Sequence, residues 1–284
     1  EGAFLSNHVF DAYKKESKTS PLKDIGVVAT ADMVKSLARL PDRVATVCGG
    51  TLLARDWVST PANHKTPYLL GKAMAREAEA AGLRVTVMEE KALAEKDFGA
   101  VMAVAQGSQN PPRLVIMEYA PEGAKKTAVL VGKGVTFDTG GINLKSSEGL
   151  KGMKSDMAGA AGAAAALIAL GRLRPGFRVV GIMPLVENMP SGDAIRPGDI
   201  IRTYSGKSVE IGNTDAEGRL ILADALAYGV EQYKPDLIVD MATLTGACIM
   251  ALGEKIAAVF SGDDDLAAAI EAAGQKTHER CWRM

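Results

Sequence analysis

Stretches of helical periodicity alternate with short apolar runs along most of the chain. Apolar residues spaced three or four apart are typical of an amphipathic helix, whereas a short β-branched run between turn residues is typical of a buried strand. At the beginning, the pattern predicts helical spacing within residues 1–16, a polar linker at 14–23 and a short strand at 25–30. A long helix is then expected from Pro41, and the turn-forming cluster at 59–63 ends it.

Helices and strands alternate regularly beyond residue 66. Strands are expected at 83–88, 113–119, 126–131, 177–183, 236–241 and 255–261, and helices at 66–81, 91–95, 100–104, 150–173, 218–233, 244–252 and 264–276. The segment 184–198, with three prolines, is expected to be a loop, and residues 199–204 and 207–211 a hairpin. Near-continuous apolar strands separated by helices predict an α/β fold, with a mixed, mostly parallel sheet sandwiched by helices.

Composition and charge argue against several classes of protein. The 33 basic and 34 acidic residues give a formal net charge of −1, which leaves no basic footprint for nucleic acid. The 47% hydrophobic content is typical of a soluble globular protein, and no uninterrupted apolar run approaches the ~20 residues of a membrane span. Neither CxxC nor HExxH spacing occurs among Cys48, Cys248, Cys281, His8, His64 and His278. We therefore expect a cytoplasmic location and a metal, if any, held mainly by oxygen.

The octapeptide Asn-Thr-Asp-Ala-Glu-Gly-Arg-Leu at 213–220 places Asp215, Glu217 and Arg219 at every second position. In an extended segment these side chains would point to the same side. Two carboxylates held so close need a cation between them, unless one stays protonated or the turn splays them into water. The octapeptide alone leaves a metal site and a solvated turn equally open.

A second dense stretch, residues 131–145, starts at the carboxyl end of an apolar strand, where open α/β sheets place their ligands. Its glycines have neither the GxxxxGK[ST] spacing nor the third glycine of a dinucleotide turn, which disfavours a phosphate loop. The alternative is that Lys133 and Asp138 leave the sheet edge into a shared site, where glycines let the backbone approach closely. Asp156 follows near a helix start, where a carboxylate is by itself only a favourable partner of the helix dipole.

Carboxylates and cations thus gather at strand ends and helix starts. The set comprises Asp138, Asp156, Asp215 and Glu217 together with Lys133, Lys145 and Arg219. Hard divalent ions prefer oxygen-rich sites, and two ions that share carboxylates can bind a substrate and a hydroxide at once. Metal-assisted hydrolysis is therefore the leading class, and a dinuclear phosphoesterase remains an alternative that the same carboxylates could serve.

The octapeptide, the stretch 132–145, Met153-Lys154-Ser155-Asp156-Met157 and Ala242-Thr243-Leu244-Thr245-Gly246-Ala247 together resemble the leucyl (cytosol) aminopeptidase family of dinuclear metallopeptidases. The resemblance covers nearly the whole chain, and NTDAEGRL is highly specific to that family. It implies an enzyme that removes leucine or another bulky apolar residue from peptides with a free N-terminus. It also implies a homo-oligomer, a hexamer of two stacked trimers, and no membrane partner.

The resemblance implies two divalent ions per subunit, Mn²⁺ or Zn²⁺, and a ligand for each position. Asp138 and Glu217 look like the carboxylates that bridge both ions. Lys133, as a neutral amine, and Asp156 would complete the tighter site, and Asp215 the exchangeable one. An adjacent dication disfavours the ammonium form of a lysine, which makes an amine ligand chemically reasonable.

The resemblance also implies two catalytic residues and a substrate pocket. Lys145 is similar in position to the lysine that polarises the scissile carbonyl and stabilises the oxyanion. Arg219 resembles the arginine that holds a bicarbonate ion as general base, because an arginine keeps its own proton. The positions that match the pocket or grip the substrate backbone are Met153, Thr243, Leu244 and Gly246. Met153 is almost equally well explained as a core methionine.

The chain departs from the family pattern at both ends. Residues 1–40 resemble only the final piece of an N-terminal macro-like domain with its linker, and residues 41–284 resemble a catalytic domain that is incomplete at its C-terminus. An incomplete sheet is expected to expose apolar edges. Some relatives also bind nucleic acid as regulators, but the charge of −1 disfavours that function here.

Overall fold

A computed structural model describes residues 1–16 and 24–284, so that residues 17–23 of the expected linker lie outside the described part. The chain divides into two compact units, Glu1–Thr243 and Leu244–Met284. We describe each unit by itself. The domain boundary expected near residue 40 stays a prediction.

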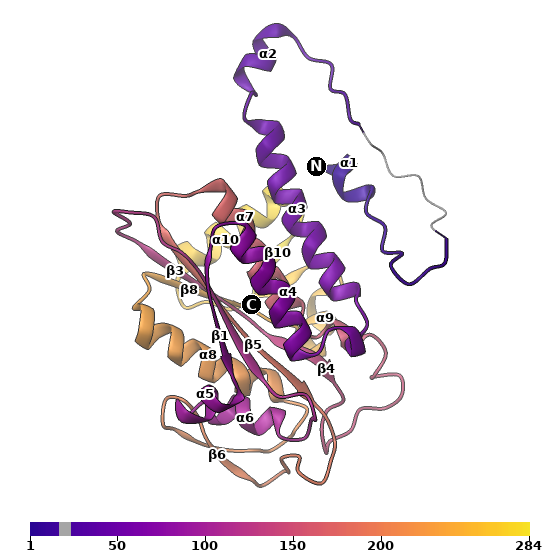
Figure 1. Cartoon of the computed structure of the whole chain (residues 1–284), viewed down its shortest axis with the longest axis vertical. Coiled ribbons are helices and arrows are strands. Elements are labelled where there is room, and N and C mark those ends of the chain that lie inside the picture. Colours follow the sequence, from indigo (N-terminus) through magenta and orange to yellow (C-terminus); the bar gives the residue numbers. More distant parts are fainter. Residues whose placement is uncertain (17–23) are drawn as a thin grey trace. The chain divides into compact units, whose positions relative to one another are not determined.

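The first unit contains a six-stranded sheet with the order β1-β2-β5-β3-β8, in which β4 also pairs with β5 (Figure 1). The strands are β1 (Arg84–Glu89), β2 (Arg113–Tyr119), β3 (Thr127–Gly132), β4 (Gly134–Asp138), β5 (Arg178–Asn188) and β8 (Leu237–Met241). The pairs β1/β2 and β2/β5 are antiparallel, whereas β3/β5, β4/β5 and β3/β8 are parallel. This confirms the predicted mixed, mostly parallel sheet.

Helices cover both faces of the sheet. One layer is α3 (Leu40–Ser59), α4 (Pro67–Ala80) and α7 (Ala158–Leu173), and the other is α5 (Glu90–Glu95), α6 (Gly99–Ala105) and α8 (Glu217–Tyr233). Alternate residues of one strand point to opposite faces, so Val115 of β2 packs with the first layer and Ile116 with the second. Each face therefore has its own buried hydrophobic core.

The remaining elements are short. In the first unit they are α1 (Gly2–Ser6), α2 (Ala31–Ser36), the 3₁₀ helices η1 (Ala62–His64) and η2 (Met153–Ser155), and the hairpin of β6 (Ile200–Arg202) and β7 (Ser208–Glu210). The second unit contains α9 (Gly246–Leu252), β9 (Ala257–Val259), α10 (Asp264–Thr277) and β10 (Cys281–Arg283). Its two strands, β9 and β10, pair in parallel. The sequence analysis did not predict β10.

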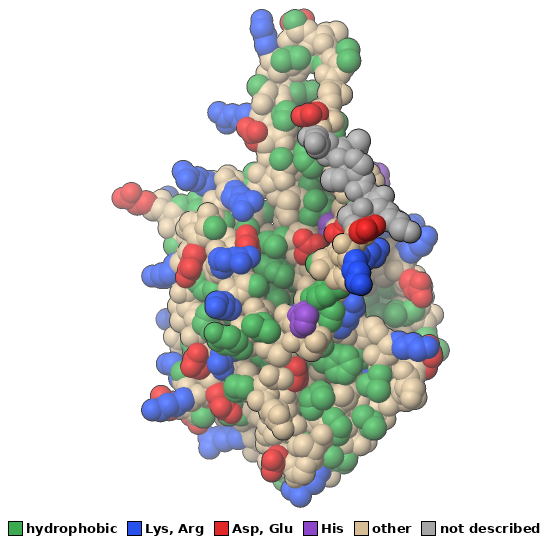
Figure 2. Space-filling view, turned by 45° about the vertical axis from the view of Figure 1, so that its right-hand side comes forward, with side chains coloured by type: hydrophobic (Ala, Val, Ile, Leu, Met, Phe, Trp, Pro, Cys, Tyr) green, Lys and Arg blue, Asp and Glu red, His purple; other side chains and the backbone are tan. Residues whose placement is uncertain are grey.

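The strand expected at 25–30 is wrong. Residues 24–29 have no regular secondary structure, and Thr30 caps α2 by accepting a hydrogen bond from the Met33 backbone. Val27 and Val28 are 84% and 103% exposed, and hydrophobic side chains lie at the surface around α2 (Figure 2). The run is apolar enough for a strand, but within the described residues no strand pairs with it.

Three boundaries near the centre of the chain also differ from the expectation. β5 runs on through Pro184, which pairs with Leu114 of β2, so the loop begins only after Asn188. Because the segment 184–198 contains three prolines, we predicted that the strand ends at residue 183, which is too early. The helix expected from residue 150 starts at Ala158, because Gly152 at φ 83° and η2 precede it. Residues 134–138, expected to lie beyond the sheet edge, form β4.

One helical stretch, Met153–Leu173, is long and apolar enough to cross a membrane by length and composition alone. Its most apolar window is 61% buried inside the protein, as in the core helix of a globular fold. Gly159 shows how closely this helix packs, since a Cβ there would lie 2.0 Å from the backbone oxygen of Met241. The stretch is therefore weak support for a membrane span.

Asp224 of α8 joins three elements through one buried carboxylate. It is 0% exposed, and its oxygens accept hydrogen bonds from the backbone N–H groups of Ala100 and Val101 at the start of α6 and of Tyr204 beside the hairpin. Burial raises the pKa of Asp224, and the three donors oppose this shift. The carboxylate satisfies helix-terminal N–H groups that have no partner within the helix.

We predict that Asp224→Ala lowers the free energy of unfolding by about 3 kcal/mol, because three buried N–H groups lose their acceptor. Urea unfolding followed by circular dichroism measures this loss as a lower midpoint at unchanged slope. Glu231→Ala, on the exposed end of the same helix, is the control. Equal midpoints for the two variants would contradict the role of Asp224.

Candidate metal centre

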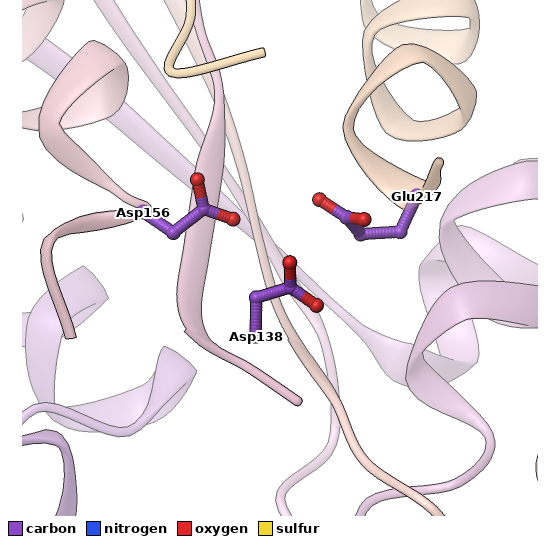
Figure 3. A group of neighbouring side chains, drawn as sticks. All are labelled: Asp138, Asp156 and Glu217. Atoms are coloured by element: carbon purple, nitrogen blue, oxygen red, sulfur yellow. The ribbon is translucent and has the colours of Figure 1, made fainter. Parts of the chain in front are cut away.

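Three carboxylates converge from three elements at one end of the sheet (Figure 3). Asp138 is the last residue of β4, Asp156 directly follows η2, and Glu217 is the first residue of α8. One oxygen of each lies within 4.8 Å of the other two, and the residues are only 2%, 5% and 2% exposed. The sequence analysis expected these three side chains to share a site, and the structure brings them together.

Two lysines lie among the carboxylates. Lys133, in the break between β3 and β4, is 3% exposed, and its Nζ lies 2.8 Å from Asp156 Oδ2 and 2.8 Å from Glu217 Oε1. Lys145 Nζ lies 2.9 Å from Asp138 Oδ2 and forms a second, short ion pair with Asp215. Each ammonium group therefore joins two carboxylates. The octapeptide at 213–220 thus does not form a turn that splays its carboxylates into water.

The octapeptide is not extended throughout, and this changes the position of Arg219. Because α8 begins at Glu217, Arg219 lies about 200° further around the helix axis rather than on the same side. Its side chain is exposed, and none of the described residues forms a hydrogen bond or ion pair with it. The structure therefore does not bring Arg219 into the charged cluster, and its role stays a prediction.

Glycines let the backbone come close to the cluster. A Cβ at Gly218 would lie 2.5 Å from Lys133 Cε, so only glycine leaves room for the lysine beside the start of α8. Gly140 and Gly141 have φ angles of 86° and 65°, a region that favours glycine, and they turn the chain directly after Asp138. The glycines thus let the backbone lie close to the charged cluster, as expected, and do not form a phosphate loop.

A hydrogen-bonded frame behind the cluster was missed by the sequence analysis. Asn188, 2% exposed at the end of β5, donates from Nδ2 to Asp138 Oδ1 (2.8 Å) and to the backbone oxygen of Thr214 (3.0 Å). Thr214 Oγ1 in turn donates to the Gly140 backbone oxygen (2.6 Å), and the Asn143 side chain accepts from Thr214 N (2.8 Å). The role of Asn188 could have been predicted from its pairing with Asp138 across β4 and β5. The expectation of a loop at 184–198 excluded that pairing.

The cluster carries more negative than positive charge. Four carboxylates face two ammonium groups, which leaves two negative charges in excess when all six are ionised. Burial raises the pKa of Glu217 to about 7, Lys133 opposes this shift and Asp138 adds to it. Burial also raises the pKa of Asp156. Although burial opposes the charge of Lys133, Asp156 and Glu217 hold its pKa above the ordinary value.

The residues present fit a divalent cation. Among the buried side-chain atoms of the described residues, Asp156 Oδ2 alone has no hydrogen bond, although it lies 2.8 Å from Lys133 Nζ. The Lys133 ammonium is therefore its ionic partner, and without an aligned hydrogen bond the oxygen keeps the capacity to bind a metal ion as well. The oxygen-rich donor set and the excess of negative charge both favour a hard or borderline ion.

The expected substrate positions are distributed over both units. Met153 is half-buried in η2. Thr243 reaches the cluster itself, because its backbone oxygen accepts from Lys133 Nζ (2.8 Å) and its Oγ1 donates to Asp156 Oδ1 (2.7 Å). Leu244, which is 45% exposed, and Gly246, which begins α9, belong to the second unit.

Comparisons with known proteins point to one family. The sequence profile of the catalytic domain of the cytosol aminopeptidase family matches residues 52–284. Proteins named probable cytosol aminopeptidase from Chlorobaculum tepidum and Chlorobium limicola are 44% and 46% identical to the chain. Both alignments cover 100% of this chain and 58% of the relative, so the chain spans little more than half the length of these relatives.

Solved structures give the same result. The bottromycin maturation enzyme BotP in complex with Mn is 41% identical, with a TM-score of 0.91 over 100% of this chain and 60% of that one. The leucine aminopeptidase LAP1 of Caenorhabditis elegans is 36% identical, with a TM-score of 0.84 over 86% of this chain and 50% of that one. With a profile match over most of its length and a buried carboxylate cluster at the sheet edge, the chain belongs to the cytosol aminopeptidase family.

Proposed function

We propose that this chain forms the catalytic part of a metal-dependent aminopeptidase, a hydrolase that removes the N-terminal residue from peptides. The observation that carries this proposal is the buried cluster of Asp138, Asp156 and Glu217 with its unbalanced negative charge. The names of the relatives and the manganese in the BotP complex support it. The relatives' name, cytosol aminopeptidase, also supports a soluble protein of the cytoplasm.

Five residues would hold two divalent ions, Mn²⁺ or Zn²⁺. Asp138 and Glu217 would serve both ions, Lys133 and Asp156 would complete one position, and Asp215 would complete the other. When bound, the two ions would supply the Lewis acidity that makes water nucleophilic near neutral pH and would bind the substrate α-amine. Because Asp156 and Glu217 hold the proton on Lys133 in this structure, Lys133 must give up that proton to act as an amine ligand.

Lys145 and Arg219 would act on the reacting groups. Although partial burial lowers the pKa of Lys145, its ion pairs with Asp215 and Asp138 raise it above the ordinary value. Its Nζ can therefore donate to the scissile carbonyl oxygen and stabilise the oxyanion that develops there. Arg219 lies in the first turn of α8, where the helix dipole also attracts anions, and it would hold a bicarbonate ion that accepts a proton from the attacking water.

The proposed substrates are peptides with a free N-terminus and leucine or another bulky apolar first residue. A blocked amine could not serve as a ligand, which restricts the reaction to the chain end. Met153, Thr243, Leu244 and Gly246 are the proposed pocket and backbone contacts. The proposed assembly is the hexamer implied by the family resemblance, with no membrane partner and no nucleic acid.

The first experiment measures hydrolysis of a leucine anilide by the 284-residue chain with added Mn²⁺ or Zn²⁺. We expect release that depends on the ion and stops when a chelator is added, because the carboxylates alone cannot activate water at neutral pH. Hydrolysis that continues at full rate in excess chelator would contradict a metal mechanism. Hydrolysis of a phosphate monoester without hydrolysis of the anilide would favour the phosphoesterase alternative.

Substitution of the bridging carboxylates tests the site directly. We expect Asp138→Ala and Glu217→Ala to abolish both metal loading and hydrolysis, because each removes a ligand of both ions. Metal content by mass spectrometry and anilide hydrolysis are the measurements. Glu95→Ala, at an exposed position of α5, should match the unchanged chain in both. Full activity of either bridging variant would refute the assignment.

Arg219→Ala tests the proposed anion site. We expect kcat to fall about 100-fold, in the range that a general base contributes, while metal content stays unchanged because Arg219 contacts none of the carboxylates. Steady-state kinetics with and without added bicarbonate measure the effect, and Arg219→Lys should retain part of the activity. Loss of metal from the Arg219→Ala protein would show that the residue acts on the cluster instead.

A further inference from the structure

Asn188 connects the two strand ends and the loop that carry the cluster. Its backbone oxygen accepts hydrogen bonds from Thr139 N (3.0 Å) and Thr139 Oγ1 (2.7 Å), so the end of β5 is fixed to the residue after Asp138. Its side-chain Nδ2 reaches Asp138 Oδ1 at the end of β4 and the Thr214 backbone oxygen in the octapeptide. One buried residue thus fixes the relative position of Asp138 and the segment that leads to Glu217.

The two oxygens of Asp138 have different surroundings. Oδ1 accepts from Asn188 Nδ2 (2.8 Å) and from the backbone N–H of Gly140 (2.9 Å). Oδ2 lies 2.9 Å from Lys145 Nζ, which also forms an ion pair with Asp215. Two donors on one oxygen fix the plane of the carboxylate and leave the second oxygen directed into the cluster.

The amide is the side chain that this position requires. Both partners of Nδ2 are acceptors, so the NH₂ group must face them, and its two hydrogens serve one acceptor each. A carboxylate of the same shape would have no hydrogen to donate and would place a further negative charge 2.8 Å from Asp138. The exchange of Asn188 for Asp therefore removes the contact while it preserves the volume.

We propose that Asn188 is a positioning residue that orients Asp138 for metal binding and thereby sets the affinity of the centre for divalent ions. The inference rests on the proposed function, since it concerns the same site. It adds a residue that touches neither ion nor substrate and acts only through the Asp138 carboxylate. Hydrogen-bond partners of metal ligands typically change metal affinity 10- to 100-fold.

The test measures Mn²⁺ binding to the metal-free chain by calorimetry, together with the electron paramagnetic resonance spectrum of the bound ion. For Asn188→Asp we expect Mn²⁺ to bind at least about 10-fold more weakly, with an altered spectrum of the ion that remains bound. Asn188→Ser, which keeps a short donor without the added charge, should lie between this variant and the unchanged chain. Asn63→Asp, the same change at an exposed position, is the control and should bind as the unchanged chain does.

Circular dichroism of the metal-free variants separates positioning from folding. Folded variants with weakened binding support the inference, and folded variants with unchanged affinity and spectrum overturn it. If Asn188→Asp does not fold, Asn188→Ser decides in the same way. If the unchanged chain does not bind Mn²⁺, the proposed function fails first. If it binds Mn²⁺ but both variants bind equally well, only the role of Asn188 fails.

Discussion

Buried negative charge that must be balanced is the constraint on which the site depends. A carboxylate removed from water is stable only beside a cation or several hydrogen-bond donors. Here Lys133 and Lys145 each join two carboxylates, and Asn188 and Gly140 donate to Asp138. The surrounding elements, from the end of β4 to the start of α8, are arranged so that these partners can meet.

The sheet provides this arrangement through an interrupted strand. β3 pairs with β5 up to Val131, and β4 resumes pairing with β5 at Gly134, so Lys133 lies in the break. The backbone of Lys133 remains fixed there, since its N–H donates to Met241 O (2.9 Å) and its oxygen accepts from Ala160 N (2.8 Å). The break therefore frees the side chain for the cluster while the main chain keeps its hydrogen bonds.

Much of the fold could be predicted because its central strands β3 and β5 are mostly apolar and its helices have clear ends, as in α3 and α4. The charged residues of the cluster could be predicted from residue type and from their positions at strand ends. Asn188 could not, because its importance comes from register with Asp138 across two strands, and a proline-rich sequence concealed that strand. The octapeptide led to a wrong expectation for the direction of the Arg219 side chain, for a different reason. Its every-second-residue pattern fits an extended chain, but the helix starts in the middle of it, which turns Arg219 away.

The long sequence distances between the members of the cluster affect the order of events during synthesis. Lys133 and Asp156 are separated by β4, one loop and η2, but Glu217 and Thr243 come far later along the chain, and Thr243 follows β8. A nascent chain that ends at residue 200 contains Lys133 and Asp156 but neither Glu217 nor Thr243. Contacts so distant in sequence form late in folding, because loop closure must come first. The charged cluster is therefore completed only after the strands and helices that carry its members have come together.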